Sequence, residues 1–313
     1  MAHLFNSGLF FSESAWHGLG VTLPADSPVR YSIDDAIAIS GLDWRVETRP
    51  VFVDGKEIPS HKAVVRPDTG DVFGVVGDRY RPLQNRDQFN WFRPFLESGE
   101  CQFETCGSLK GGALVWVLAK VNRADAEISA DDRIRKYLLL TSSHDGSRST
   151  SLGFCPIRVV CWNTLSAGLR DDRSTLLKVK HTASQLRALR TIRETVNLVN
   201  ETFEATAAQY RKLIACNVDR AGIRQYVKKV LKLADDEADY STRQRNILEN
   251  VVGLCTNGVG NDGRTAWSAY NGVTQYVTHA YGRNADSRLR AAWYGEGRRI
   301  NDRAFAVALQ LAG

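Results

Sequence analysis

The chain has 313 residues and a formal net charge of +6, with 43% hydrophobic and 24% charged residues. This composition is typical of a globular protein large enough for one or two cores, and the modest positive charge favours an anionic partner without naming it. The longest apolar run, residues 113–119, is too short to cross a bilayer, and residues 1–16 lack the pattern of a secretion signal. Six cysteines without a CxxC pair indicate reduced thiols, so we expect a cytoplasmic protein without membrane association.

Short-range signals predict the helices and strands of the first half of the chain. Ser32 and Asp35 form a capping box and Gly41 follows, so a short helix is expected between them. A second helix should begin at Asn85 and end before Gly99. Apolar runs bounded by turn residues predict five strands, the first three as a meander, at residues 46–53, 58–66, 72–76, 102–108 and 113–121.

A β-hairpin is expected next. It combines an apolar run at residues 137–140, a tight-turn sequence at residues 144–147 and an alternating return strand. Pro156 suits the first position of a helix, so a helix is expected to begin there and to cover the sheet, carrying Arg158 and Asn163. One more strand is expected within residues 176–181, with Lys178 and Lys180 on one side.

From residue 184 onward the pattern is helical. Apolar residues in steps of three and four from Leu189 to Leu213 predict a long helix with a seam for another helix, which also suggests self-association. Further helices are expected at about residues 219–233, 241–255, 265–281 and 301–311. We therefore expect an α+β fold, with a curved antiparallel sheet (meander and hairpin) and crossing helices in residues 1–181 and a helical domain in residues 182–313.

Basic residues gather at turns and edges of the predicted sheet, with aromatic residues among them. Positive grooves lined by aromatic rings are typical of proteins that bind single-stranded nucleic acid. The alternative is that the rings form the core, as expected for Trp116, and that the cations form a solvated rim. The candidate nucleic-acid-binding residues are Arg79, Arg81, Lys110, His144, Arg148, Arg158, Asn163, Lys178, Lys180 and His181.

The sequence lacks the usual signals for catalysis. Its cysteines and histidines do not have metal-site spacing, and no GxSxG, Walker or HExxH motif is present. We therefore expect no catalytic residue, metal ion or cofactor. A polar stripe at Asn271, Gln275 and His279 could face a ligand or pack inside the chain.

Several short motifs occur in a fixed order over nearly the whole chain. They are Trp16–Gly20, Tyr80–Asn85, His144–Ser147, Arg158–Leu165, Lys180–Thr182 and Thr265–His279. Together they resemble the phage and plasmid proteins grouped as the domain of unknown function 932 family, although Trp162 and Gly272 depart from that pattern. The order of elements is also similar to the fold of RecT- and Redβ-type single-strand annealing proteins, which bind single strands in a basic groove.

These observations favour a phage- or plasmid-type protein that binds and anneals single-stranded DNA and forms a homo-oligomer. Arg81, Arg148 and Arg158 would contact phosphates together with the lysines of residues 178–180. Two alternatives remain open: a metal-dependent enzyme acting on nucleic acid, centred on His144, Asp145 and His181, or a mobile-element protein that binds host defence factors.

Overall fold

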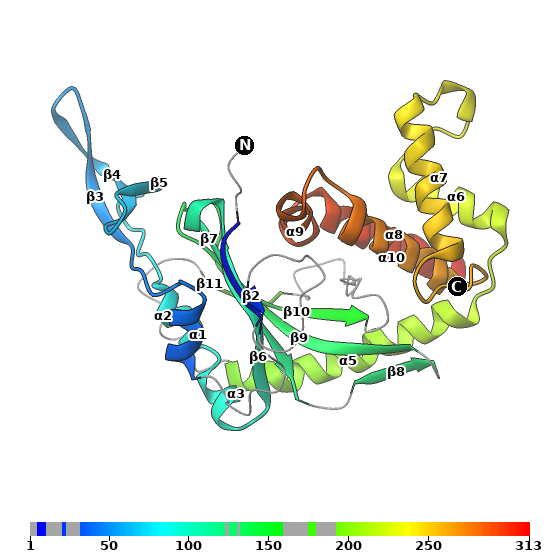
Figure 1. Ribbon diagram of the computed structural model, residues 1–313, viewed down its shortest axis with the longest axis horizontal. Helices are drawn as coiled ribbons and strands as arrows, with labels where there is room; N and C mark the ends of the chain where they lie inside the picture. Colours follow the sequence, from blue (N-terminus) through cyan, green and yellow to red (C-terminus); the bar gives the residue numbers. More distant parts are fainter. Residues whose placement is uncertain are drawn as a thin grey trace. The chain divides into compact units, whose positions relative to one another are not determined.

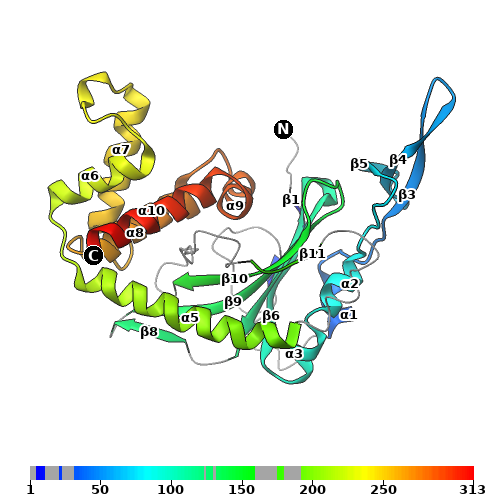
Figure 2. The same ribbon diagram turned by 180° about the vertical axis from the view of Figure 1, so that it is seen from behind.

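The computed structural model describes residues 5–10, 21–22, 32–122, 125–129, 132–158, 175–179 and 192–313 (Figures 1 and 2). The chain divides into two compact units, and each is described here by itself. Unit 1 comprises Met1–Arg123, Tyr137–Phe154 and Thr175–Val199, and unit 2 comprises Ala124–Lys136, Cys155–Ser174 and Asn200–Gly313. The predicted domain boundary between residues 181 and 182 lies outside the described residues.

The larger sheet contains eight strands in the order β11-β10-β9-β7-β6-β1-β2, with β8 paired to β9 off this path. Its strands are β1 (Phe5–Phe10), β2 (Val21–Thr22), β6 (Cys101–Leu109), β7 (Leu114–Val121), β8 (Ala126–Ser129), β9 (Asp132–Ser143), β10 (Thr150–Arg158) and β11 (Thr175–Val179). Strand β1 is parallel to β2 and antiparallel to β6, and the β6–β7, β7–β9, β8–β9 and β10–β11 pairs are antiparallel. Residues 114–119 of β7 are buried, which confirms the expected central strand.

A separate three-stranded meander in unit 1 consists of β3 (Glu47–Val53), β4 (Lys56–Arg66) and β5 (Asp71–Gly77) (Figure 1). The β3–β4 turn contains Asp54 and Gly55, both at positive φ, as a two-residue hairpin turn requires. These strands match the predicted ones to within two residues at each end.

The helices of unit 1 are short. Helix α1 (Ile33–Ile39) begins with the predicted capping box of Ser32 and Asp35. The helix expected from Asn85 to Gly99 is divided into α2 (Asn85–Asn90) and α3 (Arg93–Glu97), and its N-cap is Gln84. Asn85 is not the cap because its side chain is buried and bonds to the chain outside the helix.

The helix expected to begin at Pro156 is wrong over the described residues, because β10 continues to Arg158. Among the described residues the β10–β11 register covers residues 150–153 of β10, and Pro156 lies beyond these pairs, near the end of the strand. Residues 159–174, with Asn163, lie outside the described part of the chain.

Unit 2 is mainly helical. Its helices are the C-terminal part of α5 (Ile192–Ala215), α6 (Arg220–Leu231), α7 (Thr242–Asn257), α8 (Ala266–Gln275), the π-helix η5 (Tyr276–Ala280), α9 (Ala285–Tyr294) and α10 (Glu296–Ala312). Short 3₁₀ helices occur at η1 (Lys110–Gly112) in unit 1 and η4 (Glu237–Asp239) in unit 2. Ser241 and Gln244 form a capping box at the start of α7, and Thr265 caps α8, in agreement with the helix starts predicted at about residues 241 and 265. Helix α9 was not expected from the sequence. The predicted α+β fold, with an antiparallel sheet and a helical C-terminal part, is confirmed.

The described end of the predicted Leu189–Leu213 seam is internal. Phe203, Tyr210 and Leu213 are buried within unit 2, and the Tyr210 ring packs against Trp267, Tyr270 and Phe305. This part of the seam is therefore core and leaves no surface for a second copy of the chain. Among the described residues, no helix has the length and apolar character needed to span a membrane.

Candidate functional site

The turn between β9 and β10 in unit 1 is anchored by His144. The His144 ring is buried, and its Nε2 atom lies 2.9 Å from Oδ1 of Asn85. Asn85 in turn donates from Nδ2 to the carbonyl oxygens of Leu42 at 3.0 Å and Trp44 at 3.4 Å. The imidazole also contacts the rings of Trp44 and Phe73. His144 therefore braces the turn from inside, and its side chain is not exposed to a ligand in this conformation.

Ser143, the last residue of β9, joins two arginine-bearing segments. Its carbonyl oxygen accepts a hydrogen bond from the Tyr80 hydroxyl at 3.1 Å. The Ser143 hydroxyl accepts from the backbone N–H of Arg148 at 3.0 Å and lies 3.1 Å from the Arg148 carbonyl oxygen, to which it can donate. Arg79, Arg81 and Arg148 are all exposed. We call these three side chains the arginine junction.

The guanidinium of Arg81 is held close to its own loop. Its Nη1 atom lies 3.2 Å from the carbonyl oxygens of both Asp78 and Tyr80. Arg81 is nevertheless exposed, and so is Arg148 in the turn opposite. Ser143 thus joins the segment that carries Arg79 and Arg81 to the turn that carries Arg148, more than sixty residues later in the sequence.

Lys110 has a local countercharge. Its Nζ atom lies 3.6 Å from a carboxylate oxygen of Asp145. Burial acts to raise the pKa of Asp145, but hydrogen bonds from Ser147 and Ser143 and the charge of Lys110 together bring this pKa below its ordinary value. Lys110 thus contributes less net positive charge to the surface than an unpaired lysine.

The remaining candidates lie on or beyond β11. Lys178 pairs in register with Ser151 of β10, whose hydroxyl lies 3.0 Å from that of Thr141 in β9. Lys180 and His181, like Asn163, lie outside the described residues. Of the aromatic residues expected among the cations, Trp116 and Tyr137 are fully buried and present no ring face for stacking.

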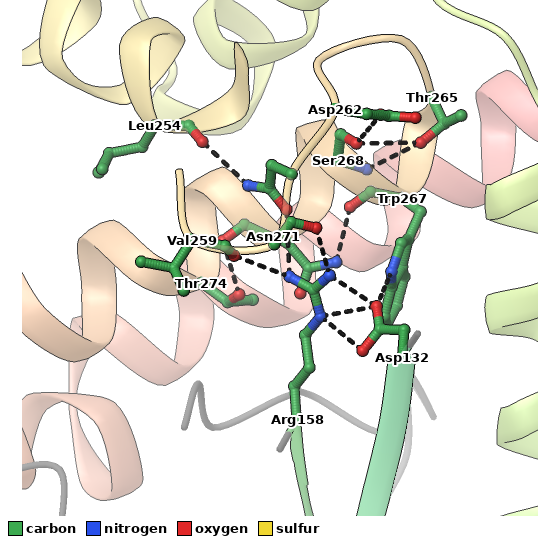
Figure 3. Close-up of polar contacts among 12 residues, drawn as sticks. Asp132, Arg158, Leu254, Val259, Asp262, Thr265, Trp267, Ser268, Asn271 and Thr274 are labelled. Atoms are coloured by element: carbon green, nitrogen blue, oxygen red, sulfur yellow. Dashed lines mark hydrogen bonds and ion pairs between the residues drawn. The ribbon is translucent and has the colours of Figure 1, made fainter. Parts of the chain in front are cut away.

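Arg158 lies in a different environment, at the end of β10 in unit 2 (Figure 3). The residue is 1% exposed, and its Nε donates to both carboxylate oxygens of Asp132 at 2.8 and 2.9 Å. Its Nη2 lies 2.6 Å from Oδ2 of the same carboxylate and donates to the Gly260 carbonyl at 2.7 Å. Its Nη1 donates to the Val259 carbonyl at 3.3 Å and to Oδ1 of Asn261 at 3.1 Å.

The same carboxylate reaches helix α8. The indole Nε1 of Trp267 donates to Oδ2 of Asp132 at 2.8 Å, and the Arg158 guanidinium lies 5.5 Å from the centre of the Trp267 ring system (Figure 3). Asn261 donates onward to the carbonyl oxygen of Leu254 in α7 at 2.9 Å. We call Asp132, Arg158, Asn261 and Trp267, with the carbonyls of Val259 and Gly260, the Arg158 cluster. It joins two strands to the loop that connects α7 with α8.

This arrangement changes the interpretation of Arg158. A buried charge is stabilised only if it is paired and its remaining donors are satisfied, and here the carboxylate, two carbonyls and an amide oxygen provide those partners. The expected exposure of Arg158 to phosphate is wrong for the described conformation. Asp132 was missed because no strand was predicted between residues 121 and 137, although a buried arginine requires a carboxylate partner.

The beginning of α8 is locally stabilised next to the cluster. The Ser268 backbone N–H donates to Oγ1 of Thr265 at 3.1 Å, and the Ser268 hydroxyl donates to Oδ1 of Asp262 at 2.5 Å. This last hydrogen bond is the main cause that lowers the pKa of Asp262. Further along α8, Asn271 is buried and donates to the Trp267 carbonyl at 2.8 Å, whereas His279 is exposed. Asn271 of the predicted polar stripe therefore packs inside the chain.

Thiols and metal ligands offer no further site in the described part of the chain. Burial raises the pKa of Cys101, Cys106 and Cys155 to about 12, so these thiols are poor nucleophiles. Within the described ranges, no group of three or more His, Cys, Asp or Glu side chains is placed to hold a metal ion.

The fold and these two regions define an α+β protein with an exposed arginine junction and a buried ionic cluster. The sequence profile of the family described as Domain of unknown function (DUF932) matches residues 72–293. The chain therefore belongs to the DUF932 family, and both regions lie within the matched residues. No curated protein and no solved structure matches the chain.

Proposed function

We propose that this chain binds single-stranded DNA through the arginine junction. The observation that carries the proposal is that Ser143 bonds both to Tyr80, which lies between Arg79 and Arg81 in the sequence, and to the backbone of Arg148. The side chains of all three arginines are exposed. A guanidinium group presents donors in a planar fork that fits a phosphate, and it keeps its charge at any physiological pH. The net charge of +6 adds a long-range attraction for a polyanion.

In this proposal the contacts are to phosphates, and the binding is therefore independent of base sequence. Lys178, Lys180, His181 and Asn163 are further candidates for phosphate contacts. Lys110, in η1, lies next to the turn through its ion pair with Asp145, and His144 supports the turn from inside. Arg158 is not part of the contact set, because its donors are used inside unit 2.

The proposal extends to the phage or plasmid setting and to the annealing role that the resemblance to RecT- and Redβ-type proteins implies. Annealing requires that two complementary strands be aligned on a charged surface, and it requires no covalent step. Several copies of the chain would hold a longer strand than one copy can, so self-association is part of this proposal.

Titration of a labelled single-stranded oligonucleotide at several salt concentrations tests the binding step. The logarithm of the binding constant should fall with the logarithm of the salt concentration by about 0.7 per phosphate contact. Arg81→Ala and Arg148→Ala should each reduce that slope by about 0.7 and weaken binding alike for every base sequence. Arg220→Ala removes an exposed arginine from unit 2 and should change neither quantity.

The proposed site is wrong if folded Arg81→Ala and Arg148→Ala proteins keep the wild-type slope and affinity. The annealing step has its own readout, the rate at which two complementary labelled strands pair with and without protein. If the protein binds single strands but does not accelerate their pairing, the binding proposal stands and the annealing proposal is wrong.

A further inference from the structure

The small β3–β4–β5 sheet carries most of the exposed large apolar side chains in the described part of the chain. Phe52 is 58% exposed, Val72 62% and Val75 56%, and Val53 is exposed beside Phe52 at the hairpin tip. The register pairs β5 with residues 61–66 of β4. The part of β4 nearer the hairpin tip, from residue 56 to residue 60, pairs with β3 alone, so the tip is a two-stranded ribbon (Figures 1 and 2). Ribbons of two strands are marginally stable in water by themselves, and apolar groups at such a tip favour a covering partner.

The pairing register places Val72 and Val75 on one face of this sheet. Val72 is opposite Val65, and Val75 is opposite Ala63. Residues two apart in a strand share a face, as do directly paired residues, so all four lie on the same side. Val72 and Val75 are three apart in sequence, and they share a face because the register shifts by one residue between these pairs.

The other face of the sheet is covered. Gly74 and Val76 point away from Val75, and both adjoin the β9–β10 turn. A Cβ atom on Gly74 would lie 2.8 Å from the Asp145 carbonyl oxygen, and one on Gly146 would lie 2.7 Å from Cγ1 of Val76. We call the face with Val72 and Val75 the outer face. On this face Val65 is itself buried, at 3% exposed, and the exposed apolar side chains are those of Val72 and Val75 on the outer strand β5.

The charges of this sheet argue against a polyanionic partner. Residues 47–77 contain five acidic and four basic side chains, so the surface is not a phosphate-binding one. Two opposite charges, Glu47 and Arg49, pair on β3 at 2.7 Å, and both are about half exposed. They lie on the outer face, because Glu47 is opposite Val65 and Arg49 is opposite Ala63.

We propose that the outer face binds a second copy of this chain across a two-fold axis. In a two-fold interface the same patch is used by both copies, so a patch must complement itself. Apolar Val72 and Val75 next to one acidic and one basic side chain meet that requirement, because Glu47 of each copy can pair with Arg49 of the other. This inference deepens the self-association in the proposed function by naming the surface that performs it.

Light scattering on a sizing column over a hundredfold range of protein concentration tests the surface. Wild-type protein should have a mass above 34.8 kDa that rises with concentration. The double variant Val72→Lys/Val75→Lys should remain at 34.8 kDa, because burying two lysines against a second copy is unfavourable. Ile39→Lys, which changes an exposed apolar residue of α1 in the same unit, is the matched control and should behave as wild type.

A mixing experiment identifies the partner as a second copy even if the lysine variant fails to fold. Arg49→Glu and Glu47→Arg each place like charges in the interface and should be monomeric alone. Mixed in equal amounts, they should regain the wild-type mass, because every Glu then faces an Arg. A wild-type mass of 34.8 kDa at all concentrations, or a mixture that stays monomeric, would overturn the proposal.

Mass and oligonucleotide binding are measured in parallel for the wild type and for Val72→Ser/Val75→Ser, which removes the exposed apolar groups of the outer face without changing its charge. Unchanged DNA affinity with a reduced mass supports the second copy as the occupant. Reduced DNA affinity with an unchanged mass would assign this sheet to nucleic acid instead and overturn the proposal. Because mass and DNA affinity are separate readouts, a failure of the self-association surface is distinguishable from a failure of DNA binding.

Discussion

Arg148 and Arg158 are ten residues apart in the sequence, but one is exposed and the other is buried. Arg148 is exposed in a turn held by backbone hydrogen bonds to the Ser143 side chain, and its guanidinium adds to a solvated junction. Arg158 is buried with a carboxylate and three oxygens of a distant loop around it. Two arginines with the same charge therefore differ in role because they differ in burial: an exposed arginine can bind a partner molecule, whereas a buried one must pair inside the fold.

The largest expected effect is at Asp132. Asp132→Asn leaves the Arg158 charge buried without its counterion, and we expect a loss of about 3–5 kcal/mol in the free energy of unfolding, measured by urea titration with circular dichroism. The double variant Asp132→Leu/Arg158→Met should lose much less, since neither charge is then left alone. Arg148→Ala should change stability by no more than about 0.5 kcal/mol. If Asp132→Asn and Arg148→Ala lowered the free energy of unfolding by the same amount, the predicted difference between the buried cluster and the exposed junction would be wrong.

Gly272 tests how tightly α8 must pack beneath the Arg158 cluster. A Cβ atom there would lie 2.4 Å from both the backbone N and the Cα of Cys255 in α7. Gly272→Ala should therefore force the helices apart and destabilise the protein by about 1–3 kcal/mol in a thermal or urea titration. Gly253→Ala in α7, where a Cβ atom meets nothing within 4 Å, is the control and should be neutral or stabilising by up to about 1 kcal/mol.

Asn85 tests the internal support of the arginine junction. Asn85→Ala removes hydrogen bonds to the Leu42 and Trp44 carbonyls and to the His144 ring. Leaving such buried groups unsatisfied costs about 1–3 kcal/mol, which thermal unfolding would detect. Asn90→Ala, at the other end of the same helix and bonded to Arg93 at the surface, should lose about 0.5 kcal/mol or less. If Asn90→Ala matched Asn85→Ala, the bracing role of Asn85 would be disproved.

The smallest effect is expected at a solvated ionic group of unit 2, and it depends on pH. Hydrogen bonds from Arg224 and then Lys228 lower the pKa of Glu237 from 4.5 to about 2. A lowered pKa contributes stability above pH 4.5, and this contribution is lost as the pH falls toward 2. Glu237→Gln should thus flatten the dependence of melting temperature on pH in that window. Asp239→Asn, an exposed neighbour, controls for the removal of a carboxylate, and an identical pH curve for the wild type and Glu237→Gln would contradict the prediction.

Local signals predicted much of the fold. The capping box at Ser32 forms as expected, because it depends on residues within one helical turn. The apolar run at residues 113–121 correctly predicted strand β7, which is buried on both faces. Pro156 was misassigned because a proline that suits the first turn of a helix also occurs near the end of a strand, where it lies here.

The candidate site was predicted less well. The arginine junction contains three of the residues selected from the sequence, but the two segments that carry them are joined by hydrogen bonds of Ser143 to Tyr80 and to the Arg148 backbone, which no sequence signal predicts. His144 was selected as a polar contact, and the structure uses it as a buried brace against Asn85, 59 residues away. Exposure of a polar side chain depends on which distant segments fold over it, and no local pattern encodes that.

The sequence alone determined many of the helices, turns and strands of this protein, because those follow from steric and hydrogen-bonding preferences between near neighbours. Tertiary structure alone decided the roles of the charged residues. Arg158 finds its carboxylate 26 residues earlier and its carbonyls about a hundred residues later, and only that assembly makes its burial stable. The register of β4 with β3 and β5 likewise decided that two valines and an ion pair share one exposed face. Contacts between segments that are distant in the sequence determine which side chains are buried. Burial in turn determines whether a charged or apolar side chain stabilises the fold or is available to a partner.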